Sequence, residues 1–197
     1  MDVLLPGEIS AIARAVPKRV GEFAAGRACA RAALATLGIR DFELLSGADR
    51  TPLWPHGIVG SITHTQGFYA AAVARATQAL ALGLDAEARD SVGPPLWRRI
   101  CTPDERRHLH TLSQSEAITL ATLIFSAKEA FYKCQYPLTR QWLNFADLGV
   151  RFDGGGFQVE PQRRLAIEQH LPAPWSGQWL LTQAHALTAV HLSPAVP

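Results

Sequence analysis

The longest helical segment of the sequence contains the run Phe125-Ser126-Ala127-Lys128-Glu129-Ala130-Phe131-Tyr132-Lys133. Glu129 and Lys133 are four residues apart, so a helix places them on one face. An exposed ion pair at this spacing is worth only about 0.3–0.5 kcal/mol. The flanking residues are mostly apolar and leave little exposed helix face, which favours a functional site over a surface ion pair. Lys128 lies about a quarter-turn from Glu129 and is expected to face solvent or a partner.

Two further carboxylates precede this helix, in the segment Gly83-Leu84-Asp85-Ala86-Glu87. In an extended strand, Asp85 and Glu87 point to the same side. Their spacing also fits a solvated strand edge, but the apolar run 79–84 before them favours a buried strand. Burying three carboxylates and a lysine is costly unless ions pair with them. Mg²⁺ prefers oxygen ligands and commonly combines carboxylates with substrate phosphate, so the two segments predict a Mg²⁺–phosphate site.

The order of the elements predicts an α+β protein, because each half reads as helix followed by antiparallel strands. Helices are expected over 7–16, from Pro17 to Leu37, from a capped start at Thr102, and from Ser113 to about Tyr136, where Pro137 closes the helix. Strands are expected over 57–63, 68–75, 80–86, 146–152, 157–160, 175–183 and 186–192. The segment 91–95 breaks the pattern and predicts an N-terminal lobe over 1–93 and a C-terminal lobe over 94–197.

Composition narrows the class of protein. The chain has 197 residues, with 48% hydrophobic and 18% charged residues, as is usual for soluble globular proteins. A net charge of +2 is too small to indicate non-specific nucleic-acid binding. Three widely spaced cysteines predict reduced thiols, and the sequence has neither a signal-peptide pattern nor an apolar run of about 20 residues. We therefore expect a cytoplasmic protein without a transmembrane segment or a nucleic-acid partner.

Five more residues are candidates for anion binding. Arg19 and Arg27 fall on similar faces of one predicted helix and suit a multiply charged anion. Arg50 lies in a predicted loop, and Thr63 and His64 follow Gly60-Ser61-Ile62. For each residue alone, a solvated cation or a structural histidine is the simpler explanation. The sequence has no GxxxxGK[ST], GxGxxG or GxSxG motif, so the common nucleotide-hydrolase, dinucleotide-binding and α/β-hydrolase classes find no support.

In their order along the chain, these segments resemble the 4′-phosphopantetheinyl transferases of the surfactin and enterobactin synthetase type, over roughly residues 12–152. The matching pieces are Gly26-Arg27-Ala28-Cys29-Ala30-Arg31, Pro52-Leu53-Trp54-Pro55, Gly60-Ser61-Ile62-Thr63-His64, Gly83-Leu84-Asp85-Ala86-Glu87, the run 125–133 and Pro137-Leu138-Thr139 with Trp142-Leu143 and Phe145. The resemblance implies two similar α+β lobes related by pseudo-two-fold symmetry, with coenzyme A in the cleft between them. It also implies transfer of phosphopantetheine to a serine of an acyl, peptidyl or aryl carrier protein, with release of 3′,5′-ADP.

The resemblance also implies roles for individual residues. Mg²⁺, with Mn²⁺ as an alternative ion, would be held by Asp85, Glu87 and Glu129. Lys133 would neutralise pyrophosphate charge, and Lys128 would assist phosphate or carrier binding. The general base would be Glu129, Asp85 or a metal-bound water. The nucleotide and its phosphates would be bound by Arg19, Arg27, Arg50, Thr63 and His64.

Two departures from the family pattern leave the ligand atoms in place: Thr63 stands where many relatives have serine, and Ala86 where isoleucine is frequent. Residues 153–197 match poorly and receive no role. Because two lobes lie in one chain, a monomer would suffice. Two other functions fit the same residues: Mg²⁺-dependent hydrolysis of coenzyme A or a nucleotide pyrophosphate, and coenzyme A binding without turnover.

Overall fold

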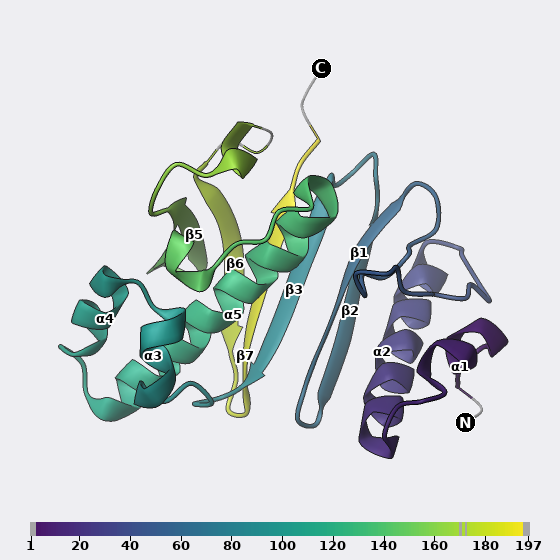
Figure 1. Cartoon of the computed structure of the whole chain (residues 1–197), viewed down its shortest axis with the longest axis horizontal. Coiled ribbons are helices and arrows are strands. Elements are labelled where there is room, and N and C mark those ends of the chain that lie inside the picture. Colours follow the sequence, from purple (N-terminus) through teal and green to yellow (C-terminus); the bar gives the residue numbers. More distant parts are fainter. Residues whose placement is uncertain (1–2, 170, 172, 195–197) are drawn as a thin grey trace. The chain divides into compact units, whose positions relative to one another are not determined.

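The computed structural model describes residues 3–169, 171 and 173–194 (Figure 1). In this part of the chain the α-helices are α1 (Pro6–Ile12), α2 (Pro17–Thr36), α3 (Pro94–Ile100), α4 (Pro103–Leu109) and α5 (Gln114–Thr139). The strands are β1 (Ile58–Thr65), β2 (Phe68–Arg75), β3 (Ala81–Ala88), β4 (Leu148–Asp153), β5 (Gly156–Pro161), β6 (Trp175–Leu181) and β7 (His185–Leu192). Two 3₁₀ turns, η1 (Phe145–Asp147) and η2 (Ala166–Gln169), complete the described elements. The predicted α+β class is confirmed.

Backbone packing divides the chain into two units. One unit contains the described residues up to Leu82 and those from Leu192 to 194, and the other lies within Gly83–His191. The sequence instead suggested a boundary at residue 93, because the segment 91–95 interrupts the pattern. The difference arises because β3 lies in the same sheet as β4–β7, in the order β3-β7-β6-β5-β4. The assignment of 1–93 and 94–197 to two lobes stays a prediction.

The first unit is built from α2 and the β1–β2 hairpin. Pro17 occupies the first turn of α2, where its missing N–H costs no hydrogen bond. The two strands pair antiparallel from Ile58↔Arg75 to Thr65↔Phe68, and Gly67 in the connecting turn has a φ of 74°. In Figure 1, α2 runs alongside this hairpin and packs against it. The buried apolar residues of this unit include Phe23, Ala30, Leu34, Leu44 and Ile58.

The second unit places α5 across the sheet that contains β3–β7, as Figure 1 shows. Helices α3 and α4 pack along α5. A buried apolar cluster joins the three helices: Val92, Trp97, Ile100, Cys101, Leu109, Ala117, Ala121 and Ile124. None of the helices in the described residues is long and apolar enough to cross a lipid bilayer.

One predicted helix end was wrong, and one helix was not predicted; proline is involved in both cases. Pro137 does not close α5, which continues to Thr139 and ends at Arg140 in the left-handed conformation (φ 55°). A proline in the last turn removes one hydrogen bond but leaves the preceding turns intact. Pro94 and Pro95, which the sequence analysis assigned to a break in the pattern, form the first turn of α3, where proline is favoured.

Other local predictions were accurate. Thr102 caps α4 as expected: its Oγ1 accepts a hydrogen bond from the Glu105 N–H at 3.2 Å, and a Glu105 carboxylate oxygen accepts from the Thr102 N–H at 2.6 Å. All three cysteines are free thiols, and Cys101 and Cys134 are buried. This agrees with the prediction of reduced, mostly buried cysteines.

Candidate functional site

The candidate site begins with a direct contact between the backbones of β3 and α5. A Cβ atom on Gly83 would lie 1.8 Å from the Ala130 carbonyl oxygen and 2.8 Å from the Cys134 nitrogen. Only glycine fits there, because both neighbours are backbone atoms that cannot move aside. Side chains alternate along a strand, so Gly83, Asp85 and Glu87 share the face of β3 that meets α5. The glycine therefore brings the two acidic residues to the helix that carries the other candidates.

Asp85 and Lys133 join β3 to α5. The Lys133 ammonium donates a hydrogen bond to Asp85 Oδ1 at 2.6 Å and to the Leu84 carbonyl oxygen at 3.2 Å. Asp85 is only 3% exposed, whereas the Lys133 side chain is 29% exposed. Half-buried Lys133 thus compensates the charge of a buried carboxylate and still reaches solvent.

Glu87 and Glu129 carry the remaining negative charge of this cluster. Burial raises the pKa of Glu87 to about 7; the charges of Asp85 and Glu129 raise it further, and Lys133 opposes them. Burial and Asp85 also raise the pKa of Glu129, again against the effect of Lys133. The four predicted residues therefore form one electrostatically coupled group. When all three acids are ionised, their charge exceeds what the one lysine neutralises.

The type of these ligands fits a hard cation, since Mg²⁺ takes oxygen ligands, often carboxylates together with substrate phosphate. As arranged here, no group of three His, Cys, Asp or Glu side chains in the described ranges is placed to hold a metal ion. Asp85 instead pairs with the Lys133 ammonium. The Mg²⁺ site at Asp85, Glu87 and Glu129 stays a prediction.

Lys128 is not where the sequence placed it. Its side chain is fully buried, so the expectation that it faces solvent or a partner is wrong. The ammonium donates hydrogen bonds to the Ile100 carbonyl at 2.8 Å, to Glu105 Oε2 at 2.7 Å and to the Phe145 carbonyl at 3.1 Å. Burial lowers the pKa of Lys128, and Glu105 opposes that change. Lys128 does lie on a different side of the helix from Glu129, as its spacing predicts. That side of α5, however, is covered by α3, α4 and η1.

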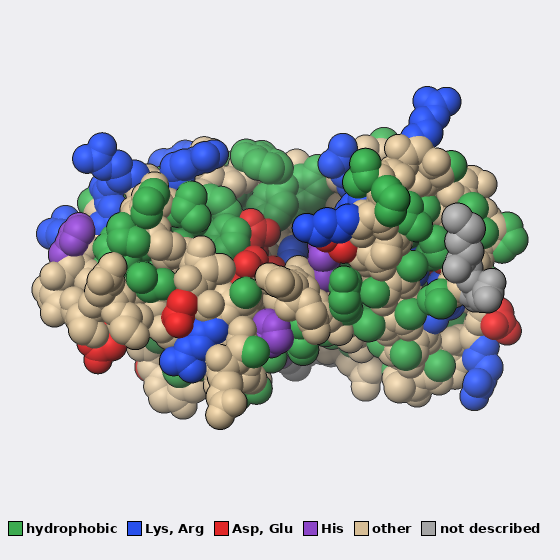
Figure 2. Space-filling view, turned by 90° about the horizontal axis from the view of Figure 1, so that it is seen from below, with side chains coloured by type: hydrophobic (Ala, Val, Ile, Leu, Met, Phe, Trp, Pro, Cys, Tyr) green, Lys and Arg blue, Asp and Glu red, His purple; other side chains and the backbone are tan. Residues whose placement is uncertain are grey.

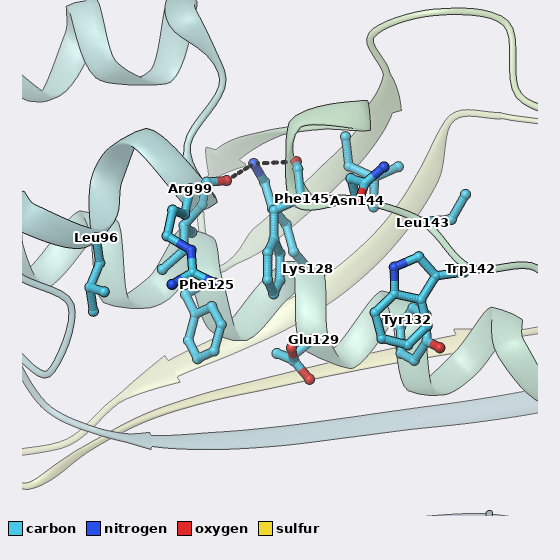
Figure 3. Close-up of a pocket in the computed structure, with 12 residues that line it drawn as sticks. Leu96, Arg99, Phe125, Lys128, Glu129, Tyr132, Trp142, Leu143, Asn144 and Phe145 are labelled. Carbon is cyan, nitrogen blue, oxygen red and sulfur yellow. Dashed lines mark hydrogen bonds between the residues drawn. The ribbon is translucent and has the colours of Figure 1, made fainter. Parts of the chain in front are cut away.

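A cavity of about 720 Å³ adjoins Glu129 within the second unit (Figure 3). Its walls come from α3, α5 and the segment 142–148, and include Arg99, Phe125, Tyr132, Trp142, Leu143 and Phe145. In Figure 3 the Lys128 ammonium and the Glu129 carboxylate point to different sides of α5. Leu96 is a lining residue that the sequence analysis missed. The apolar positions of 94–100 have helical spacing and could have indicated it, because two prolines can form the start of a helix.

In the first unit, Glu22 joins two of the predicted nucleotide-binding residues. Its carboxylate lies 3.6 Å from an Arg19 nitrogen and 3.5 Å from His64 Nε2. The Arg19 and His64 side chains are 50% and 40% exposed, so both can reach a ligand in solvent. The His64 ring stacks on Tyr69 with the centroids 6.1 Å apart. These contacts make an exposed, mixed-charge group on α2, β1 and β2.

Arg27, in contrast, is used inside the first unit. It is 6% exposed, and its guanidinium donates to the Leu44 carbonyl at 2.6 Å and to Ser46 Oγ at 2.8 Å. The guanidinium also lies 4.1 Å above the centre of the Phe23 ring. Burial lowers the pKa of Arg27. These contacts hold the segment 44–46 against α2, so Arg27 has a structural role whether or not it also meets a ligand.

The other two candidates in the first unit, Arg50 and Thr63, differ in their exposure to solvent. Arg50 is exposed in a turn and has a φ of 66°, whereas Thr63 is 2% exposed within β1. Gly60, on the same strand as Thr63, allows close packing: a Cβ there would lie 2.7 Å from the Trp54 ring. The Pro52–Pro55 segment and the Gly60 segment are therefore in contact, which no pattern in the sequence predicts.

Basic side chains do not merge into one surface on the face of the molecule seen in Figure 2. Lys and Arg occur there in several separate groups, with hydrophobic and neutral surface between them. Nucleic-acid binding proteins usually present clustered basic side chains. The absence of a nucleic-acid partner stays a prediction from the small net charge.

Comparison with known proteins identifies the family. The 4′-phosphopantetheinyl transferase N-terminal domain family matches residues 8–74, and the 4′-phosphopantetheinyl transferase superfamily matches residues 81–190. The chain is 40% identical to 4′-phosphopantetheinyl transferase Svp of Streptomyces mobaraensis, with 96% of this chain and 79% of the relative covered. It is 36% identical to 4′-phosphopantetheinyl transferase PptT of Mycobacterium tuberculosis, with 95% and 86% covered.

A solved structure is also similar: a holo-(acyl-carrier-protein) synthase from Bacillus anthracis in complex with CoA (3′,5′-ADP). It is 19% identical, covers 60% of this chain and 99% of its own, and has a TM-score of 0.45, too low to establish a common fold. The two family matches together span most of the sequence, and the coverage of both relatives is high. The chain belongs to the 4′-phosphopantetheinyl transferase superfamily and is a transferase.

Proposed function

We propose that this enzyme transfers the 4′-phosphopantetheine group from coenzyme A to a serine of an acyl, peptidyl or aryl carrier protein and releases 3′,5′-ADP. The observation that carries this proposal is the coupled group of Asp85, Glu87, Glu129 and Lys133 at the β3–α5 contact. These residues combine excess carboxylate with a half-exposed ammonium, which suits a reaction on a charged diphosphate.

Asp85, Glu87 and Glu129 would hold Mg²⁺, or Mn²⁺ in its place. The ligand type supports this assignment, as does the mutual repulsion of the three acids, which raises the pKa of Glu87 and Glu129 and which a cation would relieve. Bound there, the ion would neutralise charge on the diphosphate of coenzyme A during transfer. Such a role requires Lys133 to share Asp85 with the cation or to turn toward a substrate phosphate. Its 29% exposure leaves it room to do so.

The reaction forms a bond between the carrier serine oxygen and the β-phosphorus of coenzyme A, and breaks the bond from that phosphorus to the 3′,5′-ADP oxygen. The serine proton would go to Glu129, to Asp85 or to a water held by the ion. Burial raises the pKa of Glu129 in the metal-free site, whereas a carboxylate that holds a cation is a weak base. Lys133 would neutralise the charge that develops on the leaving diphosphate oxygen.

In the first unit, Arg19, Arg50 and His64 would bind the nucleotide part of coenzyme A. Their exposure supports this, since all three side chains reach solvent. Arg27 and Thr63, which are buried, would contribute mainly by holding the adjacent backbone. We further propose that the protein acts as a cytoplasmic monomer. Its protein substrates would be carrier proteins of siderophore, polyketide or non-ribosomal peptide synthesis. In support, some relatives are named enterobactin synthase component D.

The direct test is incubation of the purified chain with pantetheine-labelled coenzyme A, Mg²⁺ and apo-carrier proteins from different pathways. We expect label on the serine of at least one carrier and one 3′,5′-ADP per carrier modified. Excess chelator should stop transfer, and Mg²⁺ should restore it. Absence of label on every carrier offered would contradict the proposal.

The same assay without carrier protein tests the hydrolase alternative. A hydrolase would release 3′,5′-ADP from coenzyme A and water alone, whereas the transferase should release it only when carrier is present. A non-catalytic coenzyme A-binding protein would bind coenzyme A but release no 3′,5′-ADP under either condition.

A further inference from the structure

We propose that Lys128 is a positioning residue of the transfer site and not a phosphate ligand. Its ammonium ties the end of α3, the start of α4 and the η1 turn to α5, and thereby holds the walls of the cavity beside Glu129. This inference rests on the proposed function for its kinetic consequences. Its structural basis, however, is independent of the reaction.

The hydrogen-bonding capacity of Lys128 is fully used. A lysine ammonium has three N–H donors and no acceptor. In the structure the three donors are matched by three acceptors: the Ile100 carbonyl, Glu105 Oε2 and the Phe145 carbonyl, at 2.7–3.1 Å. Figure 3 shows the bonds to the two carbonyls as dashed lines. A phosphate oxygen could be bound only if one of these contacts were given up.

Glu105 extends the same network into the backbone. Its Oε2 also accepts a hydrogen bond from the Thr102 N–H at 2.6 Å, and its Oε1 accepts from the Val150 N–H at 2.7 Å. Glu105 is 8% exposed, and the Lys128 side chain is fully buried. The buried ion pair thus joins the N-terminus of α4, strand β4 and helix α5 through contacts that are all satisfied.

The network borders the cavity directly. Ile100, Lys128 and Phe145, whose atoms make these bonds, are all lining residues, as is Glu129. Because Glu129 follows Lys128 on α5, any rotation or shift of the helix that frees the ammonium would also displace the Glu129 carboxylate. A displacement of about 1 Å in a reacting group can cost a hundredfold in rate. Lys128 therefore acts on the reaction through the position of α5 and the cavity wall.

The first experiment uses the unaltered protein. The sequence contains three lysines, namely Lys18, Lys128 and Lys133, so a time course of amine modification read by mass spectrometry resolves each of them. Lys18 is exposed and should react fastest with or without coenzyme A. Lys128 should react at least about tenfold more slowly than Lys18 in the free protein, because none of its side chain reaches solvent. Similar rates for Lys128 and Lys18 would overturn the proposal.

Lys133 provides the internal comparison. It should react in the free protein and be protected by coenzyme A with Mg²⁺. Failure of that protection would count against the proposed function and leave the result for Lys128 standing. The two failures can thus be told apart in one data set.

The second experiment is a double-mutant cycle with Lys128→Met and Glu105→Gln. Each change breaks the same ion pair, so each should lower kcat about 10- to 100-fold, with KM for coenzyme A changed less than about threefold. The double variant should be no more than about threefold worse than the worse single variant. If Lys128 were a phosphate ligand, Lys128→Met would raise KM for coenzyme A and Glu105→Gln would not. The effects of the two changes would then multiply in the double variant. Those results would overturn the proposal.

Asp104→Asn is the matched control for Glu105→Gln, because Asp104 is the neighbouring acid on α4 and its side chain is 77% exposed. It should leave both kcat and KM unchanged. All variants should be assayed well below their unfolding temperatures. If Lys128→Met does not fold, Glu105→Gln and the modification rates of the unaltered protein still decide between the two roles.

Discussion

The β3–α5 contact in the second unit and the α2–β1 surface in the first unit hold the predicted site residues in different ways. At the β3–α5 contact, Gly83 lets two backbones touch, and Asp85, Glu87, Glu129 and Lys133 follow from that contact. At the α2–β1 surface, Arg19 and His64 are exposed and both contact Glu22, at 3.6 and 3.5 Å respectively.

This difference indicates a division of roles. Groups fixed by backbone contact can be held in one geometry, which catalysis requires, whereas exposed cations can adapt to a ligand. We therefore expect changes at the β3–α5 contact to lower kcat. Changes to the exposed first-unit cations should mainly raise KM for coenzyme A.

The largest effect is expected for Glu129→Gln, which keeps the side-chain shape but removes a candidate base and proposed metal ligand. Transfer should fall about a thousandfold, within the range that general acid–base groups supply. Stability should not fall, because burial disfavours the charge that this change removes. The measurement is kcat for carrier labelling, with the exposed Glu160→Gln as the control. Unchanged labelling by Glu129→Gln would remove this residue from the mechanism.

The next effect tests the backbone contact itself. Gly83→Ala should cost about 3 kcal/mol in the free energy of unfolding, or more, because the new Cβ must push β3 and α5 apart. Transfer should fall as well, since the carboxylates move with the strand. The matched control is Gly21→Ala in α2, where nothing lies within 4 Å of the new Cβ, and a gain of about 0.5–1 kcal/mol is expected. Urea denaturation measures both, and equal stability of the two variants would contradict the tight contact.

Lys133→Ala and Arg19→Ala compare the two regions directly. Lys133→Ala should lower kcat about a hundredfold, because a developing charge loses its cation and Asp85 loses its ion pair. Arg19→Ala should leave kcat within about twofold and raise KM for coenzyme A about tenfold, as expected for one exposed charged contact. Steady-state kinetics with coenzyme A varied at saturating carrier measures both constants. The reverse pattern would refute the division of roles.

A smaller effect concerns the pH dependence of stability without metal or coenzyme A. The pKa of Glu87 is raised from its ordinary value of 4.5 to about 7. Between these values the folded state binds the proton more tightly than the unfolded state, so the free energy of unfolding falls as pH rises. Allowing for partial exposure, the loss is about 2 kcal/mol. Glu87→Gln should flatten the stability profile between about pH 4.5 and 7, and an unchanged slope would show that Glu87 does not titrate as proposed.

Much of the second-unit site could be predicted from the sequence. A strand places alternate residues on one face, which here are Gly83, Asp85 and Glu87. A helix places residues four apart on one face, here Glu129 and Lys133, and the structure has a strand and a helix at these positions. The sequence could not show which strand meets the helix. That depends on the close approach at Gly83, a contact between residues almost 50 positions apart in the chain.

The burial of charged residues was harder to predict. Lys128 and Arg27 look like surface cations in a one-dimensional pattern, yet segments 17 or more positions away cover both: 100–105 and Phe145 for Lys128, and 44–46 for Arg27. Their partners are mostly backbone carbonyls, which every residue provides and which therefore leave no trace in the sequence. The paired acid Glu105 was noticed only for its role in the α4 cap.

The central claim is that one divalent ion is bound by acids of both β3 and α5. Crystals grown with coenzyme A and Mn²⁺, measured at the manganese absorption edge, test it most directly. We predict a single anomalous peak within about 2.5 Å of carboxylate oxygens of Glu129 and of Asp85 or Glu87, with the diphosphate completing the coordination. A peak that lacks Glu129, or lies away from the β3–α5 contact, would contradict the account.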